Sequence, residues 1–142
     1  MSWKLFTQEM VDEVLRLQDT DPELQSRLKD LNFNFIVVGT DAPGNEDRKI
    51  EITLKGGRFV GDANVDIQAA PSNLRSPTFD KTRFDAKVIG DHQILCDMIN
   101  GKMDILEMLQ KVVVVGDFGK FMSHLNGFKS FFQYLSTIGI EP

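Results

Sequence analysis

The sequence has a single cysteine and no long apolar run. Cys96 has no second cysteine to pair with in the 142-residue chain, so an intramolecular disulfide is excluded and a reducing compartment is expected. No stretch approaches the roughly 18 apolar residues that a membrane-spanning helix needs. Near the N-terminus, Glu9, Asp12 and Glu13 interrupt the apolar pattern, which excludes a signal peptide there. These absences predict a soluble, cytoplasmic protein.

Positive charge is also scarce. Lysine and arginine number 16 against 21 aspartate and glutamate residues, which gives a net charge of −5 at pH 7. Nucleic-acid-binding proteins usually carry a basic face, so this class is disfavoured. The chain has the length of one ordinary domain and can bury a core without disulfides or metals. We therefore expect a single domain over residues 1–142 that does not bind nucleic acid.

Helices are expected at the start of the chain. Residues 2–18 carry apolar side chains at helical spacing, Phe6 among them, opposite an acidic face. Asp21 and Pro22 fit the cap and the first residue of a shorter second helix, which would run to about Lys29.

Strands are expected next, because the apolar residues change to a period of two. The alternating segments are 31–39, 48–57, 58–70 and 83–90. Gly56 and Gly57 fit a tight hairpin, whereas residues 71–82, with two prolines, fit a longer loop. Strands with one apolar face predict an antiparallel sheet that is covered on one side and wet on the other.

Short helices and one more strand complete the pattern. Asp91 fits the N-cap of a helix that ends at Gly101, and a second short helix is expected at about 104–110. The segment 111–117, "KVVVVGD", lacks alternation and predicts a strand that is buried on both faces or lies in the middle of the sheet. Asp117 would cap the closing helical region. The fold class is α+β, with about five largely antiparallel strands and helices on one face.

The most specific stretch of the chain is "FDAKVIGDHQILCDMINGKMDILEMLQKVVVVGDFGKFMSHL", residues 84–125. It holds Asp-Ala before a strand, a capped helix ending in a Gly-Lys turn, a short helix, a strand ending in Gly-Asp and a hydrophobic helix. This order resembles the sterol carrier protein type 2 family of lipid-binding domains. The chain departs from the family's pattern at Asp104-Ile105, where Asn-Pro is frequent, and in its longer connection at 71–82.

The resemblance implies a hydrophobic tunnel between the sheet and the helices. Such a tunnel would hold a fatty acid, acyl-CoA, sterol or isoprenoid-like lipid, with no chemistry done on it and no cofactor. Four of the six methionines fall between Met98 and Met122, and methionine adapts to ligands of varied shape. The residues expected to line the tunnel are Ile94, Leu95, Met98, Met103, Met108, Phe118, Phe121, Met122, Leu125, Phe128 and Phe132. Without the resemblance, the same stripes would fit an ordinary core.

The aromatic segment 127–135 leaves an alternative open. Phe128, Phe131, Phe132 and Leu135 exceed what one small sheet face is expected to bury. The segment could therefore form a lid, a surface for transient membrane contact or a homodimer interface. An interface would favour the alternative function, an accessory or dimerisation module serving an enzyme or a lipid-cofactor biosynthesis complex.

Catalysis finds little support in the sequence. His92 and Cys96 lie four residues apart, a spacing that could pair an imidazole with a thiol. No third group is evident to orient the imidazole, and a surface histidine beside a buried cysteine explains both positions. Residues 117–119 spell Asp-Phe-Gly, but the chain lacks the other parts of a kinase. We therefore expect a protein that is not an enzyme.

Metal binding finds equally little support. His92 and His124 are scattered and have no acidic or thiol residues beside them to complete a ligand set. Asp62, Asn64 and Asp66 alternate on one face of an expected strand, which fits a solvated face more simply than a calcium site. No metal ligand is predicted.

Overall fold

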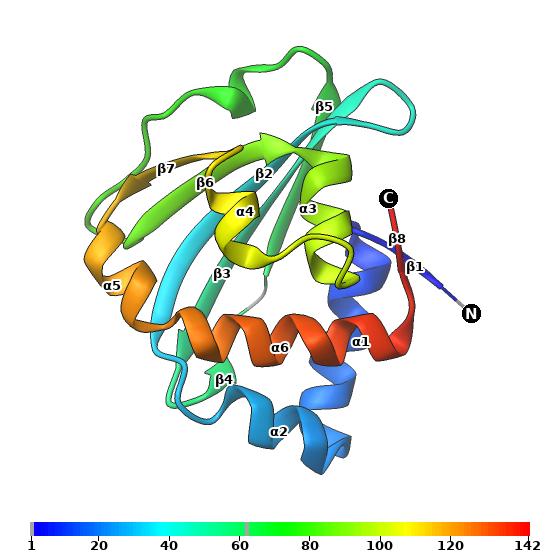
Figure 1. Ribbon diagram of the computed structural model, residues 1–142, viewed down its shortest axis with the longest axis vertical. Helices are drawn as coiled ribbons and strands as arrows, with labels where there is room; N and C mark the ends of the chain where they lie inside the picture. The colour runs from blue at the N-terminus through cyan, green and yellow to red at the C-terminus, as the bar shows by residue number, and fades with distance from the viewer. Residues whose placement is uncertain (1, 62) are drawn as a thin grey trace.

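The computed structural model describes residues 2–61 and 63–142, which form a twisted sheet with helices layered on one face (Figure 1). In chain order the elements are β1 (Trp3–Lys4), α1 (Gln8–Thr20), α2 (Pro22–Leu28), β2 (Phe33–Ala42), β3 (Glu46–Lys55), β4 (Arg58–Phe59), β5 (Asn64–Ala69), a 3₁₀ turn η1 (Asn73–Arg75), β6 (Ala86–Asp91), α3 (His92–Ile99), α4 (Ile105–Leu109), β7 (Val113–Gly116), α5 (Phe118–Ser123), α6 (Leu125–Ile138) and β8 (Ile140–Glu141).

The main sheet has the strand order β4-β3-β2-β6-β7, and β5 also pairs with β3. Strands β2 and β6 are parallel, whereas β2–β3, β3–β4, β3–β5 and β6–β7 are antiparallel. The prediction of an α+β fold with a largely antiparallel sheet is therefore confirmed. The β2–β3 register pairs Phe33 with Leu54 and Phe35 with Ile52, so the alternating apolar residues of both strands share the face that the helices cover.

The N-terminal helix begins later than its apolar spacing predicts. Thr7 caps α1 by accepting the Met10 N–H, and Phe6 lies before the helix in a left-handed conformation with φ 58°. Residues Trp3–Lys4 form β1 instead, parallel to β8 at the other end of the chain. The prediction of a helix over 2–18 is wrong for its first turn, because pairing with β8 satisfies that backbone in extended form.

Three predicted helix caps are confirmed. The carboxylates of Asp21, Asp91 and Asp117 accept N–H groups in the first turns of α2, α3 and α5. The closing helical region breaks at His124, which separates α5 from α6. Within the described residues, none of the helices combines the length and the apolar character needed to cross a bilayer.

Two strand predictions are wrong in detail. The valine run forms β7 at the edge of the sheet, with β6 as its neighbour, and Val113 is 53% exposed. A run without alternation therefore does not lie in the sheet's middle here. The segment 58–70 forms two strands, β4 and β5, and each pairs with a different part of β3.

The second face of the sheet is not left to water. Ile36 and Val38 of β2 point to this face and form a second apolar cluster with Leu74 and Phe84, against which Phe79 packs. The long connection from β5 to β6 supplies these covering residues and passes over the top of the sheet in Figure 1. The expectation of one wet face is thus wrong along β2, and Phe84 belongs to this second face, not to the helix-covered one.

A buried carboxylate fixes that connection to the sheet. Asp47 on β3 is fully buried and accepts hydrogen bonds from Arg75 Nε and Nη2, both 2.9 Å long, and from the Ser72 hydroxyl at 2.7 Å. The backbone N–H groups of Ser72 and Asp41 also donate to it. The Arg75 guanidinium holds the pKa of Asp47 far below its usual value, with further lowering from Ser72.

We expect Asp47→Asn to lower the free energy of unfolding by about 2 kcal/mol at neutral pH, since hydrogen bonds to a charged group contribute about that much. Because folding lowers the pKa of Asp47, its contribution is present above about pH 4 and is lost as the pH falls further. Urea unfolding measured between pH 7 and pH 3 should therefore show that the free energy of unfolding falls less with decreasing pH in the variant than in wild type.

The matched control is Asp19→Asn. Asp19 pairs with Arg58 at 2.6 Å, but both side chains are more than half exposed. Such pairs contribute little, so the change should stay within about 0.5 kcal/mol. Equal destabilisation by the two substitutions would contradict the role given to Asp47.

Candidate functional site

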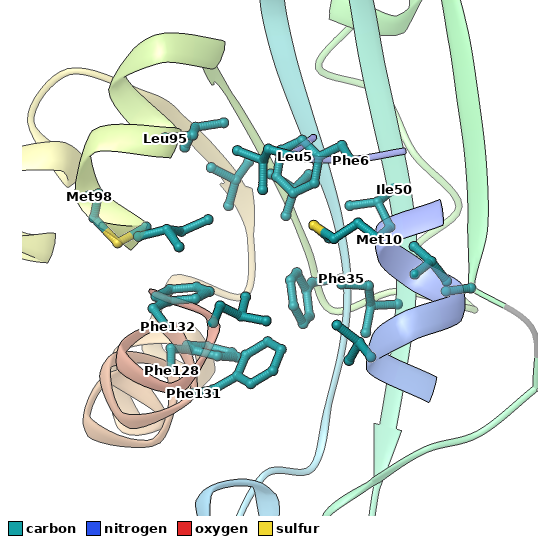
Figure 2. A pocket seen from close by; sticks show the side chains of 18 of the residues that line it. Leu5, Phe6, Met10, Phe35, Ile50, Leu95, Met98, Phe128, Phe131 and Phe132 are labelled. Atoms are coloured by element: carbon teal, nitrogen blue, oxygen red, sulfur yellow. The ribbon is translucent and has the colours of Figure 1, made fainter. Parts of the chain in front are cut away.

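An internal cavity of about 80 Å³ lies between the sheet and the helices. Figure 2 shows it bounded by α1 and the strands on one side, and by α3 and α6 on the other. Every lining residue is apolar. They are Leu5, Phe6, Met10, Val11, Val14, Leu15, Phe35, Val37, Ile50, Ile52, Phe59, Ala63, Val88, Leu95, Met98, Ile99, Met108, Phe121, Phe128, Phe131, Phe132 and Leu135.

The cavity walls follow from two local periodicities. Met10, Val11 and Val14 form the apolar stripe of α1, because Val14 follows Met10 by four residues and Val11 by three, as helical neighbours do. The floor comes from alternate residues of β2 and β3, of which Phe35 and Ile52 stand opposite each other.

Aromatic rings join the start of α6 to the sheet. The Phe128 ring lies 5.4 Å from those of Phe33 and Phe35, at interplanar angles of 75° and 65°. Phe121 of α5 lies 5.3 Å from Phe128, and the Phe132 ring stacks one helical turn further along at 6.3 Å. This cluster holds α6 above the sheet at one side of the cavity.

The structure places the predicted tunnel residues in two groups. Those on the cavity are Leu95, Met98, Met108, Phe121, Phe128 and Phe132. Those away from it are Ile94, Met103, Phe118, Met122 and Leu125. Phe118 is 50% exposed, and Met103 borders a separate pocket.

The cavity walls contributed by the first half of the chain were not predicted from the sequence. Leu5, Phe6 and Met10 line the cavity, as do Phe35 and Ile50. The stripe of α1 and the alternation of the strands were visible in the sequence. Only the tertiary arrangement, however, shows that α1 packs on the same sheet face as α3 and α6 (Figure 1).

Three of the four apolar residues expected to exceed the sheet face are buried, and Phe132 is half-buried. Phe128, Phe131 and Leu135 are each at most 5% exposed, because α2, α3 and α5 pack against α6 and its rings contact the sheet. Tyr134 donates a 2.6 Å hydrogen bond to Asp21 at the cap of α2, and Arg27 of α2 donates to Ser130. The α2-facing side of α6 is thus fixed by polar contacts.

A second pocket of about 280 Å³ lies beside the cavity, and we call it the outer pocket. It shares Met98, Ile99 and Phe132 with the cavity. Its other residues are Gly101, Met103, Asp104, Ile105, Lys129 and Gln133. The outer pocket therefore has polar side chains, whereas the cavity has none.

A buried polar network lies near Leu5 and Phe6. Arg48, only 3% exposed, donates to Glu46 and to the Leu5 carbonyl at 2.9 Å each, and its Nη1 lies 3.4 Å from His92 Nε2. Since arginine can only donate, His92 Nε2 accepts and Nδ1 carries the proton. This Nδ1 has no partner within the described residues.

His92 is fully buried, which corrects the expectation of a surface histidine. It lies over Gly39, with the Phe6 ring edge-on at 5.8 Å. Burial and, to a smaller extent, the positive charge of Arg48 lower the pKa of His92 to about 4, so the imidazole is neutral at neutral pH. Burial also raises the pKa of the Cys96 thiol. Neither group is therefore charged at neutral pH, and a thiolate–imidazolium pair does not form in this arrangement.

Local contacts account for the other candidate polar sites. Asn64 is exposed and Asp66 accepts from Gln68 at 3.2 Å, while Asp62 lies outside the described residues. His124 Nδ1 lies 2.9 Å from the Lys120 carbonyl. In the part of the chain that the structure describes, no three or more histidine, cysteine, aspartate or glutamate side chains gather as a metal site.

No family model and no curated protein matches the sequence. Solved structures do match. A conserved hypothetical protein from Thermus thermophilus, described as a candidate sterol carrier protein, has a TM-score of 0.70 at 11% identity, over 100% of this chain and 95% of that one. A crystal structure of sterol carrier protein 2 has a TM-score of 0.69 at 11% identity, over 95% and 99%. Sterol carrier protein 2 from Yarrowia lipolytica, in its apo form, has a TM-score of 0.52 at 16% identity, over 88% of each chain. The fold that the sequence resemblance implies is confirmed.

We expect Gly39→Ala to lower the free energy of unfolding by about 1–3 kcal/mol, because a Cβ there would overlap His92 Nδ1 and overpack a full site. Urea unfolding measures the change. In a double-mutant cycle, Gly39→Ala should destabilise the His92→Ala variant much less than it destabilises wild type, because the side chain that the new Cβ would overlap is gone.

Gly119→Ala is the matched control. Its Cβ would meet only Asp117 Oδ1, at an ordinary 3.7 Å, inside α5. Alanine has the better helix propensity, so stability should rise by up to about 1 kcal/mol. A neutral Gly39→Ala would contradict the close packing of His92 on β2.

Proposed function

We infer that this protein is a carrier that binds a hydrophobic lipid and does no chemistry on it. Its sterol carrier protein fold and the apolar cavity between sheet and helices support this function. The acyl chain or ring system of the lipid would occupy the cavity. Among the residues predicted from sequence, Leu95, Met98, Met108, Phe121, Phe128 and Phe132 would contact it.

The absence of polar groups from the cavity lining is the observation that carries this proposal. Apolar cavities stay dry, and their walls lose packing contacts that a ligand can restore. At about 24 cal/mol per Å³, a cavity of 80 Å³ costs on the order of 2 kcal/mol. Filling it with hydrocarbon is therefore favourable in itself.

A whole lipid requires the cavity to widen. Its volume of about 80 Å³ exceeds the share of a single water molecule but is smaller than a long acyl chain. Met10, Met98 and Met108 line it, and unbranched methionine side chains can move aside without losing apolar contact. Such adaptable walls suit a binder that accepts several lipid shapes.

The energy available from burial is sufficient. At ~0.8 kcal/mol per buried methylene, a sixteen-carbon chain gains on the order of 10 kcal/mol before costs. Immobilising the lipid and widening the cavity reduce this gain, which leaves micromolar affinity within reach.

The alternative of a dimerisation module has lost the surface on which it was based. Phe131, at the centre of the expected interface, is 5% exposed and packs inside the core. A cytoplasmic location, transient membrane contact during loading, and a single carrier domain over residues 1–142 complete the proposal as predictions from the sequence.

Native mass spectrometry of the purified protein, followed by organic extraction, tests the carrier function. We expect a co-purified lipid, or stoichiometric uptake of a fluorescent fatty acid by the apo protein. An apo mass together with no uptake of the fluorescent fatty acid would sink the proposal.

Val88→Phe tests the location of binding. Val88 lines the cavity from β6 and is 4% exposed, so a phenyl ring there would fill the space and lower fatty-acid affinity at least tenfold. Fluorescence titration measures the affinity, and circular dichroism checks folding. Met98→Phe fills the cavity from α3 should the first variant fail to fold. The control is Val113→Phe on the adjacent edge strand, where affinity should not change.

A further inference from the structure

The outer pocket is placed to receive the polar end of a lipid whose tail lies in the cavity. Met98, Ile99 and Phe132 border both spaces, so a chain passing between these three side chains would reach from one to the other. Phe132 is half-buried, unlike the fully buried Phe128 one helical turn before it. It can therefore change rotamer more easily than the rings fixed in the aromatic cluster.

Lys129 supplies a positive charge at this pocket. It lies three residues before Phe132 and four before Gln133 on α6, so these side chains share one helix surface. Lys129 is exposed, and within residues 2–61 and 63–142 it takes part in no ion pair or side-chain hydrogen bond. An ammonium group beside an apolar passage is thus available to a ligand.

Gln133 adds hydrogen-bond donors beside the charge. Its Oε1 accepts from Arg27 Nη1 at 3.3 Å, which assigns the amide oxygen to the α2 side and leaves the amino group for the pocket. Asp104, the acidic residue of the pocket, is engaged by its Oδ1 in capping α4, where it accepts the Leu106 N–H at 2.8 Å. The carboxylate keeps its negative charge and its Oδ2, so the donors that the outer pocket offers are those of Lys129 and Gln133, on the α6 side.

We propose that the outer pocket binds the anionic head group of the carried lipid, a carboxylate or a phosphate, through Lys129 and Gln133, while the tail passes Met98 and Phe132 into the cavity. The inference rests on the proposed carrier function and narrows its ligand to anionic lipids. Lys129 is the residue that sets this preference.

The opposite end of the cavity suits a head group less well. Arg48 already donates to Glu46, to the Leu5 and Pro43 carbonyls and to His92. A second anion there would have to displace Glu46 or a backbone carbonyl from a buried guanidinium, at the cost of an unpaired buried acceptor. No such displacement is needed at Lys129.

The test compares lipids that differ only in head-group charge. Dissociation constants for palmitate and for hexadecanol are measured at pH 8 and low salt by displacement of a neutral fluorescent probe. Wild type should bind palmitate about tenfold more tightly than hexadecanol, whose tail has the same length. Lys129→Gln should remove most of this preference and leave the affinity for hexadecanol within twofold. Lys129→Glu should make hexadecanol the more tightly bound lipid, and high salt should reduce the preference of wild type for palmitate.

Lys81→Gln is the matched control. It removes the same charge from an exposed position in the connection that covers the other sheet face, and it should leave the preference unchanged. A parallel pair, lysophosphatidic acid and monoacylglycerol, distinguishes phosphate from carboxylate as the favoured anion. Whichever pair shows the Lys129-dependent preference names the head group.

The possible results separate this inference from the carrier function. Equal binding of the acids and the neutral lipids, or an acid preference that survives Lys129→Gln, would overturn the head-group assignment while the carrier function stands. A preference that survives Lys129→Gln but disappears in Arg48→Met would place the head group at the opposite end. Failure of wild type to bind any of the four lipids would overturn both.

Discussion

The edge-to-face contacts of Phe128 with Phe33 and Phe35 determine where α6 lies above the sheet. Rings of this size hold the start of the helix at a fixed distance from the strands. At its other end, the chain after α6 pairs through β8 with β1, and Asn100 donates to the Ile140 carbonyl at 2.8 Å. Between these two attachments the middle of α6 lies over the cavity.

Polar groups are arranged around the cavity but not in it. Arg48 and His92 form a hydrogen-bonded network beyond Phe6, in which only Nδ1 of His92 lacks a partner among the described residues. On the far face of the sheet, Asp47 fixes the connection between β5 and β6. An apolar space without hydrogen-bonding groups can hold a hydrocarbon chain but cannot orient it, because dispersion contacts have little directionality. In the proposed carrier, selectivity for the head group would come from the rim, where the outer pocket contains Lys129.

The sequence predicted secondary structure well where local chemistry determines it. The caps Asp21, Asp91 and Asp117 and the Gly56-Gly57 hairpin lie where expected, because each depends on residues within one turn of chain. It failed where burial depends on distant segments. The valines of β7 are at an edge and Phe6 precedes its helix. Phe128 and Phe131 of α6 are buried by α2 and α3 as well as by the sheet.

By itself the sequence determined the α+β fold, its resemblance to sterol carrier proteins and the apolar character of α3, α4 and α6, since periodicity and capping are local properties. Only the tertiary structure decided which apolar residues face empty space. It placed Met10 and Ile50 on the cavity and left Phe118 half exposed, although all three have the same apolar chemistry. It also brought Lys129 beside Met98. A cavity is what remains where packed elements do not meet, and no local pattern encodes that gap.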